Sequence, residues 1–167
     1  MSDTPQKTRA VFLDIDGPII NTGCYSVDKM CSMQRTVMNQ SAIGWVNRIC
    51  RQANAWLVTN STHSPYLVEG RSLKEDLVHF GMDPDIFHVD WCTAYPDKLS
   101  GGSRLGCIGE WMDEHPEIRD WIAFDDAKFT DDRRLILIDF DDGITYSKYS
   151  KGLKQFGFRN GGKELIL

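Results

Sequence analysis

Two aspartates one residue apart, Asp14 and Asp16, follow directly on a short apolar segment that ends at Leu13. The residues from Ala10 to Leu13 show no polar and apolar alternation, which predicts a buried strand of a parallel sheet. Such a strand delivers the next residues to the carboxyl edge of the sheet, where open α/β folds hold their ligands. Gly17 lets the chain turn away there. Two carboxylates in that place suit a hard cation such as Mg²⁺, and the alternative is a solvated turn.

Two later apolar segments also end in side chains that can do chemistry. Thr59 and Asn60 follow the first segment, and Asp125 and Asp126 follow the second. If all three segments are parallel strands of one sheet, their carboxyl ends share an edge. We therefore expect a hydroxyl and four carboxylates to gather at that edge.

A Gly- and Ser-rich stretch between these segments carries two cations, Lys98 and Arg104. Arg104 stands at the start of a helical pattern that leads to the Asp125 segment, and we favour it as the cation that reaches the carboxylates. Lys98, earlier in the stretch, is the alternative. Either side chain could instead be an ordinary solvated surface cation.

In chain order, the sequence offers Asp-Xaa-Asp, a hydroxyl after a strand, a cation at a helix start, and paired aspartates after a strand. This order of residue types resembles the four motifs of the haloacid dehalogenase (HAD) superfamily of phosphotransferases, and the resemblance spans most of the chain. It implies an α/β fold of the three-layer, Rossmann-like kind. A mainly parallel central sheet would be flanked by helices, with a minimal cap.

Within the superfamily, the chain is similar to a small, minimally capped group associated with nucleic-acid repair and phage-type phosphatases. The residues that carry this similarity are Leu13–Gly17, Ser103–Trp111, Ala123–Asp126 and Asp142–Thr145. Pro18 departs from that group, in which an aliphatic residue is commoner after the glycine. Residues 59–62 depart as well, because they lack a Ser-rich, Trp-Arg ending and look more like sugar-phosphate and nucleotide phosphatases. These departures leave the substrate open.

The resemblance implies a role for each residue of the first two motifs. Asp14 would attack phosphorus and form an aspartyl-phosphate, and Asp16 would protonate the leaving group and then activate water. Thr59, Asn60 and Gly17 are the expected substrate-binding residues, with the Thr59 hydroxyl and the Asn60 backbone N–H on the phosphoryl oxygens.

The resemblance also implies a Mg²⁺ site. Its protein ligands would be Asp14, the backbone carbonyl of Asp16, and Asp125, with Asp126 orienting a bound water. Without a cation, a phosphate dianion would be strongly repelled by four carboxylates.

Helical and strand patterns alternate along the rest of the chain, which predicts βαβ units and a mainly parallel sheet. Apolar spacing predicts a helix from Ala42 to Ala53, capped by Ser41. The other expected elements are a helix that begins near Pro65, contains residues 73–78 and ends at Gly81, a strand over 86–89, a helix over 105–112, a strand over 135–138 and a helix over 147–157.

With 167 residues, the chain suits a single HAD-like domain over residues 1–167, with a flap or small cap insertion over 18–40. The absence of a large cap predicts an open site, which suits a bulky or polymeric phosphomonoester or closure by a partner subunit in a homodimer. Tyr25, Met30, Met33 and Arg35 could contact such a substrate, or simply pack the flap onto the domain.

The segment from Leu137 to Gly143 looks like a second copy of the first motif, but no further hydroxyl, cation and aspartate pair follow it. We therefore expect Asp139, Asp141 and Asp142 to form a solvated loop at the rim of the site. The alternative is that one of them assists the metal or the substrate.

Composition narrows the class of protein. The formal net charge is −5 and no basic run exceeds a pair, which argues against broad nucleic-acid binding but leaves room for a local basic patch. Five cysteines without a Cys-x-x-Cys pair predict free thiols in a reducing cytosol. No stretch resembles a signal peptide or membrane span, so we expect a cytoplasmic protein without a membrane partner.

These features together predict a Mg²⁺-dependent phosphomonoester hydrolase acting on a nucleotide or on a nucleic-acid 3′ or 5′ end. A phosphatase of small metabolites such as sugar phosphates is the alternative enzyme. A protein that kept the HAD fold for binding and lost turnover is the alternative from another class.

Overall fold

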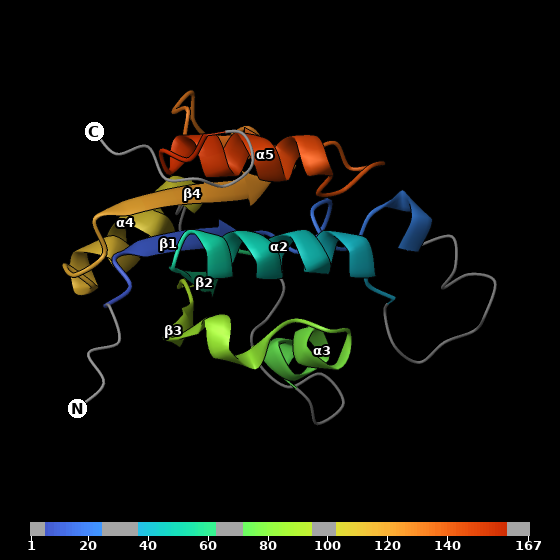
Figure 1. Ribbon diagram of the computed structural model, residues 1–167, viewed down its shortest axis with the longest axis horizontal. Coiled ribbons are helices and arrows are strands. Elements are labelled where there is room, and N and C mark those ends of the chain that lie inside the picture. Colours follow the sequence, from blue (N-terminus) through green and yellow to red (C-terminus); the bar gives the residue numbers. More distant parts are fainter. Residues whose placement is uncertain (1–5, 25–36, 63–71, 95–102, 160–167) are drawn as a thin grey trace.

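The computed structural model describes residues 6–24, 37–62, 72–94 and 103–159. Its strands and helices alternate along most of the chain, except that β5 follows β4 directly (Figure 1). The strands are β1 (Arg9–Leu13), β2 (Ala55–Thr59), β3 (Phe87–Cys92), β4 (Asp120–Asp125) and β5 (Leu135–Leu137). The helices are α2 (Gln40–Gln52), α3 (Leu73–His79), the short 3₁₀ helix η1 (Pro84–Ile86), α4 (Arg104–Glu114) and α5 (Tyr146–Gln155).

All neighbouring strands are parallel, in the order β3-β2-β1-β4-β5. The central strand β1 pairs with both β2 and β4, so that Leu13 lies level with Thr59 on one side and with Phe124 on the other. This register brings the three segments that carry chemistry to one edge of the sheet, side by side. The α/β, Rossmann-like fold class predicted from the sequence is confirmed.

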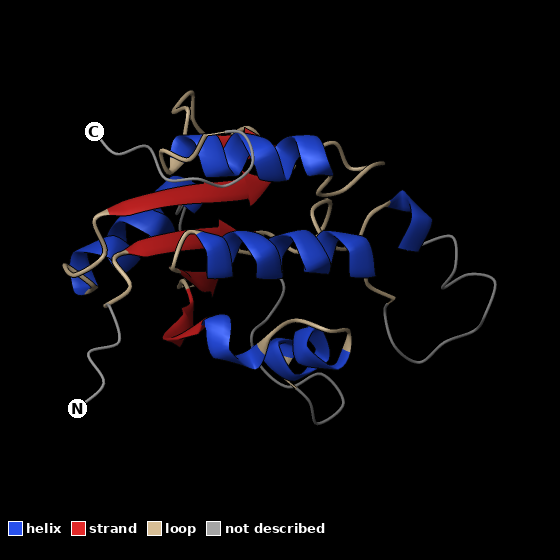
Figure 2. Ribbon diagram, in the orientation of Figure 1, coloured by secondary structure: helices blue, strands red, loops and turns tan. Residues whose placement is uncertain are grey.

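The two faces of the sheet are covered by different helices (Figure 2). On one face, Val11 and Leu13 of β1 pack in a core that includes buried residues of α2, α3 and α5. On the other face, Phe12 packs edge-on against Trp111 of α4. Because successive strand residues point to opposite faces, the buried part of β1, from Ala10 to Leu13, has to be apolar on both faces, as the sequence shows.

The structure corrects the expected start of two helices. Asn39, not Ser41, caps α2, because its side chain accepts a hydrogen bond from the Ala42 N–H and the helix begins at Gln40. Helix α3 begins at Leu73 after Ser72, which forms a capping box with Glu75, whereas Pro65 lies outside the described residues.

The other elements agree with the predicted types but differ at their ends. The expected strand over 86–89 is η1 followed by a longer β3, and the helix expected over 147–157 is α5, which begins and ends slightly earlier. The flap residues Tyr25, Met30, Met33 and Arg35 lie outside the described residues. None of the described helices is both long and apolar enough to cross a bilayer.

Candidate active site

Asp14 is a buried carboxylate at the carboxyl end of the central strand, with 1% of its surface exposed. Its backbone N–H donates to the Phe124 carbonyl and so continues the ladder between β1 and β4. The next residue of β4, Asp125, is also 1% exposed. Leu13 of β1 is paired with Phe124 of β4, and Asp14 and Asp125 are the next residues of the two strands. Their side chains therefore lie on the same face of the sheet, which is the face that α4 covers.

Arg104 lies between these two carboxylates. It is the first residue of α4, which Ser103 caps by accepting a hydrogen bond from the Gly106 N–H. The Arg104 Nη1 atom donates to Asp14 Oδ2 at 2.5 Å and also to Asp125 Oδ2. Although burial works against its charge, the hydrogen bonds and attraction of the two aspartates raise the pKa of Arg104. The preference for Arg104 as the cation of the site agrees with this geometry, whereas Lys98 lies outside the described residues.

The acidic side chains at this edge form a group that could hold a metal ion. Ligand atoms of Asp14, Asp125 and Asp126 all lie within 4.8 Å of one another. Burial, and next the negative charge of Asp14, raise the pKa of Asp125 to about 6, and the same two causes raise the pKa of Asp126. Three carboxylates and one guanidinium leave an excess of negative charge that a divalent cation would neutralise.

The second oxygen of the Asp14 side chain also indicates that this group could hold a metal ion. Asp14 Oδ1 is buried and has no hydrogen-bond partner among the described residues. A buried carboxylate oxygen left unpaired costs free energy, and a hard cation is a partner that would satisfy it. The oxygen-rich donor set and this orphaned atom therefore fit Mg²⁺.

The loop after β1 passes very close to Asp126. Gly17 has a φ of +84°, and a Cβ atom at this position would lie 2.7 Å from the Cβ of Asp126. Only glycine fits both the backbone conformation and this approach. Asp16, the second acid of the first motif, is half-buried, and its charge contributes to the raised pKa of Asp126. The predicted metal ligands and the proposed proton-transfer residue are thus close neighbours.

Thr59 ends β2 at the level of Leu13. Its hydroxyl donates to the Trp91 carbonyl at 3.3 Å, and the register puts its side chain on the sheet face opposite to that of Asp14. The Asn60 backbone N–H, expected on the phosphoryl group, donates instead to the Leu13 carbonyl at 2.8 Å. Both groups thus make hydrogen bonds within the protein, and the expected contacts with a phosphoryl group stay predictions.

The side chain of Asn60 lies on the Asp14 face. It accepts from the Thr93 hydroxyl at 2.9 Å and contacts the backbone carbonyl of Arg104 at 3.4 Å. Sequence reasoning placed a backbone group of this residue at the site and missed the side chain. The pairing of Leu13 with Thr59 decides this, because residues one position beyond a matched pair share a face, and neither segment alone contains that register.

The aspartate loop before α5 lies next to the first motif. Residues 139–142 are exposed, and the Thr22 hydroxyl donates to Asp141 at 2.5 Å. The Ile144 N–H donates to the Pro18 carbonyl, which holds the loop against the segment after Gly17. Neither group of clustered metal ligands found in the described part of the chain includes Asp139, Asp141 or Asp142. This agrees with the expected solvated rim.

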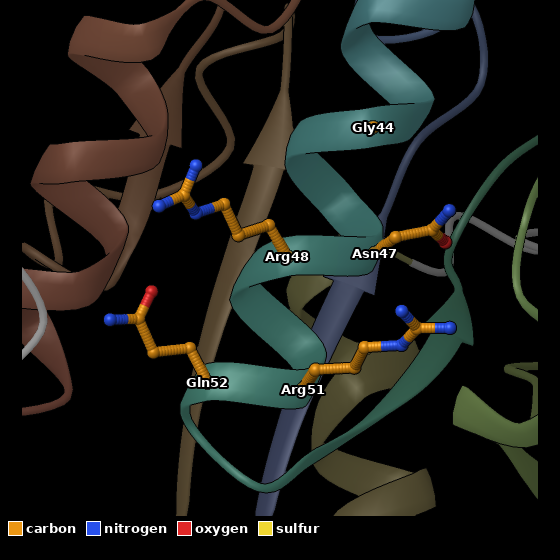
Figure 3. A pocket seen from close by; sticks show the side chains of 5 residues that line it. All are labelled: Gly44, Asn47, Arg48, Arg51 and Gln52. Atoms are coloured by element: carbon orange, nitrogen blue, oxygen red, sulfur yellow. The ribbon is translucent and has the colours of Figure 1, made fainter.

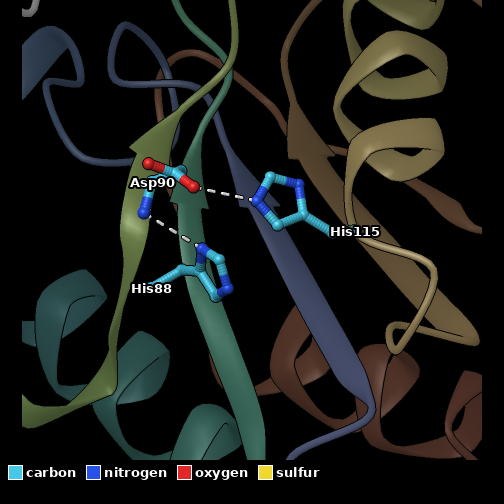
Figure 4. A group of neighbouring side chains, drawn as sticks. All are labelled: His88, Asp90 and His115. Atoms are coloured by element: carbon cyan, nitrogen blue, oxygen red, sulfur yellow. Dashed lines mark hydrogen bonds and ion pairs between the residues drawn. The ribbon is translucent and has the colours of Figure 1, made fainter.

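A second cluster, formed by His88, Asp90 and His115, joins β3 to the end of α4 (Figure 4). His115 contacts the Trp111 carbonyl through Nδ1 at 2.7 Å and Asp90 through Nε2 at 3.0 Å. Burial opposes protonation of His115, yet these two contacts raise its pKa. Burial, followed by the positive charge of His115, lowers the pKa of His88. These hydrogen bonds connect β3 to the carboxyl end of α4, which is the end opposite Arg104.

Comparison with known families agrees with this geometry. Residues 10–148 match the model of the HAD domain in Swiss Army Knife RNA repair proteins. The chain belongs to this family. The match includes all four motifs, from Asp14 to Asp126, and supports a HAD-type hydrolase domain. No curated protein and no solved structure matches the chain.

Proposed function

We propose that this HAD domain is a Mg²⁺-dependent phosphomonoester hydrolase that acts on the 3′ or 5′ end of a nucleic acid through an aspartyl-phosphate on Asp14. The observation that carries the proposal is the state of this side chain. One of its oxygens is held by Arg104, the other is buried with no partner in the described part of the chain, and Asp125 and Asp126 lie beside it. The family match to RNA repair proteins supports the choice of substrate.

Each group has a distinct part in the proposed reaction. The Arg104 guanidinium holds one oxygen of Asp14 and so orients the carboxylate that attacks phosphorus. Asp16, two residues on, would give a proton to the leaving alkoxide and later take one from the attacking water. A cation held by Asp14, Asp125 and the Asp16 carbonyl would supply charge neutralisation on the transferred phosphoryl group.

The burial of the site residues also serves the proposed chemistry. Asp14 and Asp125 are nearly inaccessible, so their charges interact in a medium of low dielectric constant, where attraction and repulsion are stronger than in water. Arg104 alone cannot balance three carboxylates. We infer that Mg²⁺ is needed before a phosphate dianion can approach.

The test is phosphate release from a mixed panel of RNA and DNA oligonucleotides with 3′ or 5′ phosphates, nucleoside monophosphates and sugar phosphates. We expect release from oligonucleotide ends that EDTA abolishes. Asp14→Asn should abolish turnover, whereas Asp142→Asn, the same change on the exposed rim, should leave it nearly unchanged. Full activity of Asp14→Asn would refute the mechanism, and turnover of sugar phosphates alone would refute the proposed substrate.

A further inference from the structure

The charges of the protein are unevenly distributed between its helices. Helix α2 carries Arg48 and Arg51, and α5 carries Lys148, Lys151 and Lys154, while neither helix contains an aspartate or glutamate. These two helices contact each other on the same face of the sheet (Figure 1). A chain with a net charge of −5 therefore has a basic face on these two helices, assembled from segments nearly a hundred residues apart.

Three of these cations are available to a ligand. Arg51 forms an ion pair with Asp83 at 2.7 Å, and Lys148 donates to the Leu137 carbonyl at 2.6 Å. Within the described part of the chain, no ion pair neutralises Arg48, Lys151 or Lys154, and all three are exposed. Exposed cations with no neighbouring acid to neutralise them attract a polyanion.

Aromatic rings lie between the cations. The Trp45 ring packs 5.0 Å from that of Tyr149 and 5.5 Å from that of Tyr146, measured between centroids. Tyr146 is 62% exposed, and the Arg48 guanidinium lies over the Tyr149 ring. A tyrosine that contacts two neighbouring rings and is still 62% exposed offers surface on which a base can stack.

The surface is hollowed beside these groups. One shallow pocket on α2 is lined by Gly44, Asn47, Arg48, Arg51 and Gln52, and in it Arg48 and Gln52 point toward α5 (Figure 3). A second on α5 is lined by Tyr146, Ser147, Ser150, Lys151 and Lys154. Both helices begin at the edge of the sheet where Asp14 lies and run away from it, α2 for about 20 Å. A strand bound along them would have one end at this edge of the sheet, although Asp14 itself faces the side that α4 covers.

We propose that the outer face of α2 and α5 binds the sugar-phosphate backbone of single-stranded RNA, with Arg48, Lys151 and Lys154 on phosphates and Tyr146 against a base. The choice of RNA rests on the proposed function. The combination of unpaired cations with an exposed aromatic ring is the pattern by which proteins hold single strands without reading their sequence.

Binding is measured by fluorescence anisotropy of a labelled single-stranded RNA that has no terminal phosphate, at several salt concentrations. The triple variant Arg48→Gln, Lys151→Gln, Lys154→Gln should lower the slope of log affinity against log salt by about 2, since each phosphate contact in a single strand contributes about 0.7. Tyr146→Ala should weaken binding about fivefold or more. The control variant Arg119→Gln, Lys128→Gln, Arg133→Gln removes the same charge elsewhere and should change neither.

Hydrolysis assays separate this inference from the proposed function. The triple variant should hydrolyse p-nitrophenyl phosphate as the wild type does, with a raised KM and unchanged kcat for phosphorylated RNA. Equal RNA affinity and salt slope of the triple variant and the wild type would overturn the inference even if the wild type is an active phosphatase. Polyglutamate and anionic vesicles should displace the labelled RNA less well than unlabelled RNA does. Equal displacement by either of them would also overturn the inference. Salt-dependent RNA binding that the triple variant loses, in a protein inactive on every phosphate ester, would support the surface and refute the proposed function alone.

Discussion

Gly17→Ala should disturb the candidate metal site, and the structure allows the effect to be separated from simple backbone strain. Gly17 has a φ of +84° and a Cβ there would lie 2.7 Å from the Asp126 Cβ. Gly81 has a φ of +106°, but apart from its chain neighbours no atom of the described residues lies within 4 Å of where its Cβ would be. Gly81→Ala is therefore a matched control that introduces the unfavourable φ without the clash.

The expected magnitudes follow from these two contributions. An alanine held in the left-handed region of φ is destabilised by about 1–2 kcal/mol. The free energy of unfolding should fall by this amount in both variants. Overpacking against Asp126 should cost Gly17→Ala about 1–3 kcal/mol more. Since relief of the clash moves Asp126, Mg²⁺ affinity should fall about 10- to 100-fold in this variant and stay unchanged in Gly81→Ala.

Urea unfolding in EDTA gives the first quantity, and calorimetric titration with Mg²⁺ gives the second. The stabilisation of each protein by saturating Mg²⁺ provides a further check, because a ligand stabilises the state that binds it. Equal losses of stability in the two variants, together with equal Mg²⁺ affinities, would refute the claim that Gly17 is required for the position of Asp126.

Three further predictions concern charge. Burial and the charge of Asp14 raise the pKa of Asp125 to about 6 in the metal-free protein, so protons compete with the metal for this carboxylate. Mg²⁺ affinity, measured by calorimetry, should therefore fall about tenfold per pH unit below pH 6. An affinity independent of pH between 4.5 and 7.5 would contradict this. Arg104→Met should lower kcat for a phosphate ester about 10²- to 10³-fold, with partial recovery in Arg104→Lys, and an unchanged kcat would exclude Arg104 from the reaction. His115→Gln should raise the pKa of His88 in an NMR titration, because a nearby positive charge is removed. Folding raises the pKa of His115, so its protonation stabilises the fold fully below the unfolded pKa of about 6.5. This contribution is lost as pH rises through the folded pKa. The variant should therefore lose more free energy of unfolding at pH 6 than at pH 8.5.

Much of the candidate site could be predicted from local sequence. A run of apolar residues that ends in Asp14 and Asp16 is typical of a central parallel strand, because such a strand is buried on both faces. The residues that follow it must then lie at the carboxyl edge of the sheet. The same reasoning found Asp125 and Asp126, which the structure places within 4.8 Å of Asp14. The preference for Arg104 followed from its place at a helix start.

Other features depend on the relation between strands, which a single segment does not contain. The register of β1 against β2 decides that the Asn60 side chain, and not that of Thr59, faces Asp14. A shift by one residue would reverse this, because side chains alternate between faces. The choice of Ser41 over Asn39 as a helix cap failed for a related reason, since both are good caps and only the local backbone decides.

The sequence by itself determined the sheet-forming segments, the acidic motifs and the type of cation, because each depends on the order of residues within a few positions. Tertiary structure alone decided that Arg104 bridges Asp14 and Asp125, that Gly17 lies against Asp126, and that α2 and α5 form one basic face. Net charge and the absence of a basic run concealed that face, since its cations are single residues on two helices that meet only when both pack on the sheet. Contacts between distant segments arise from packing of apolar faces, and their positions follow from the whole fold rather than from any one motif.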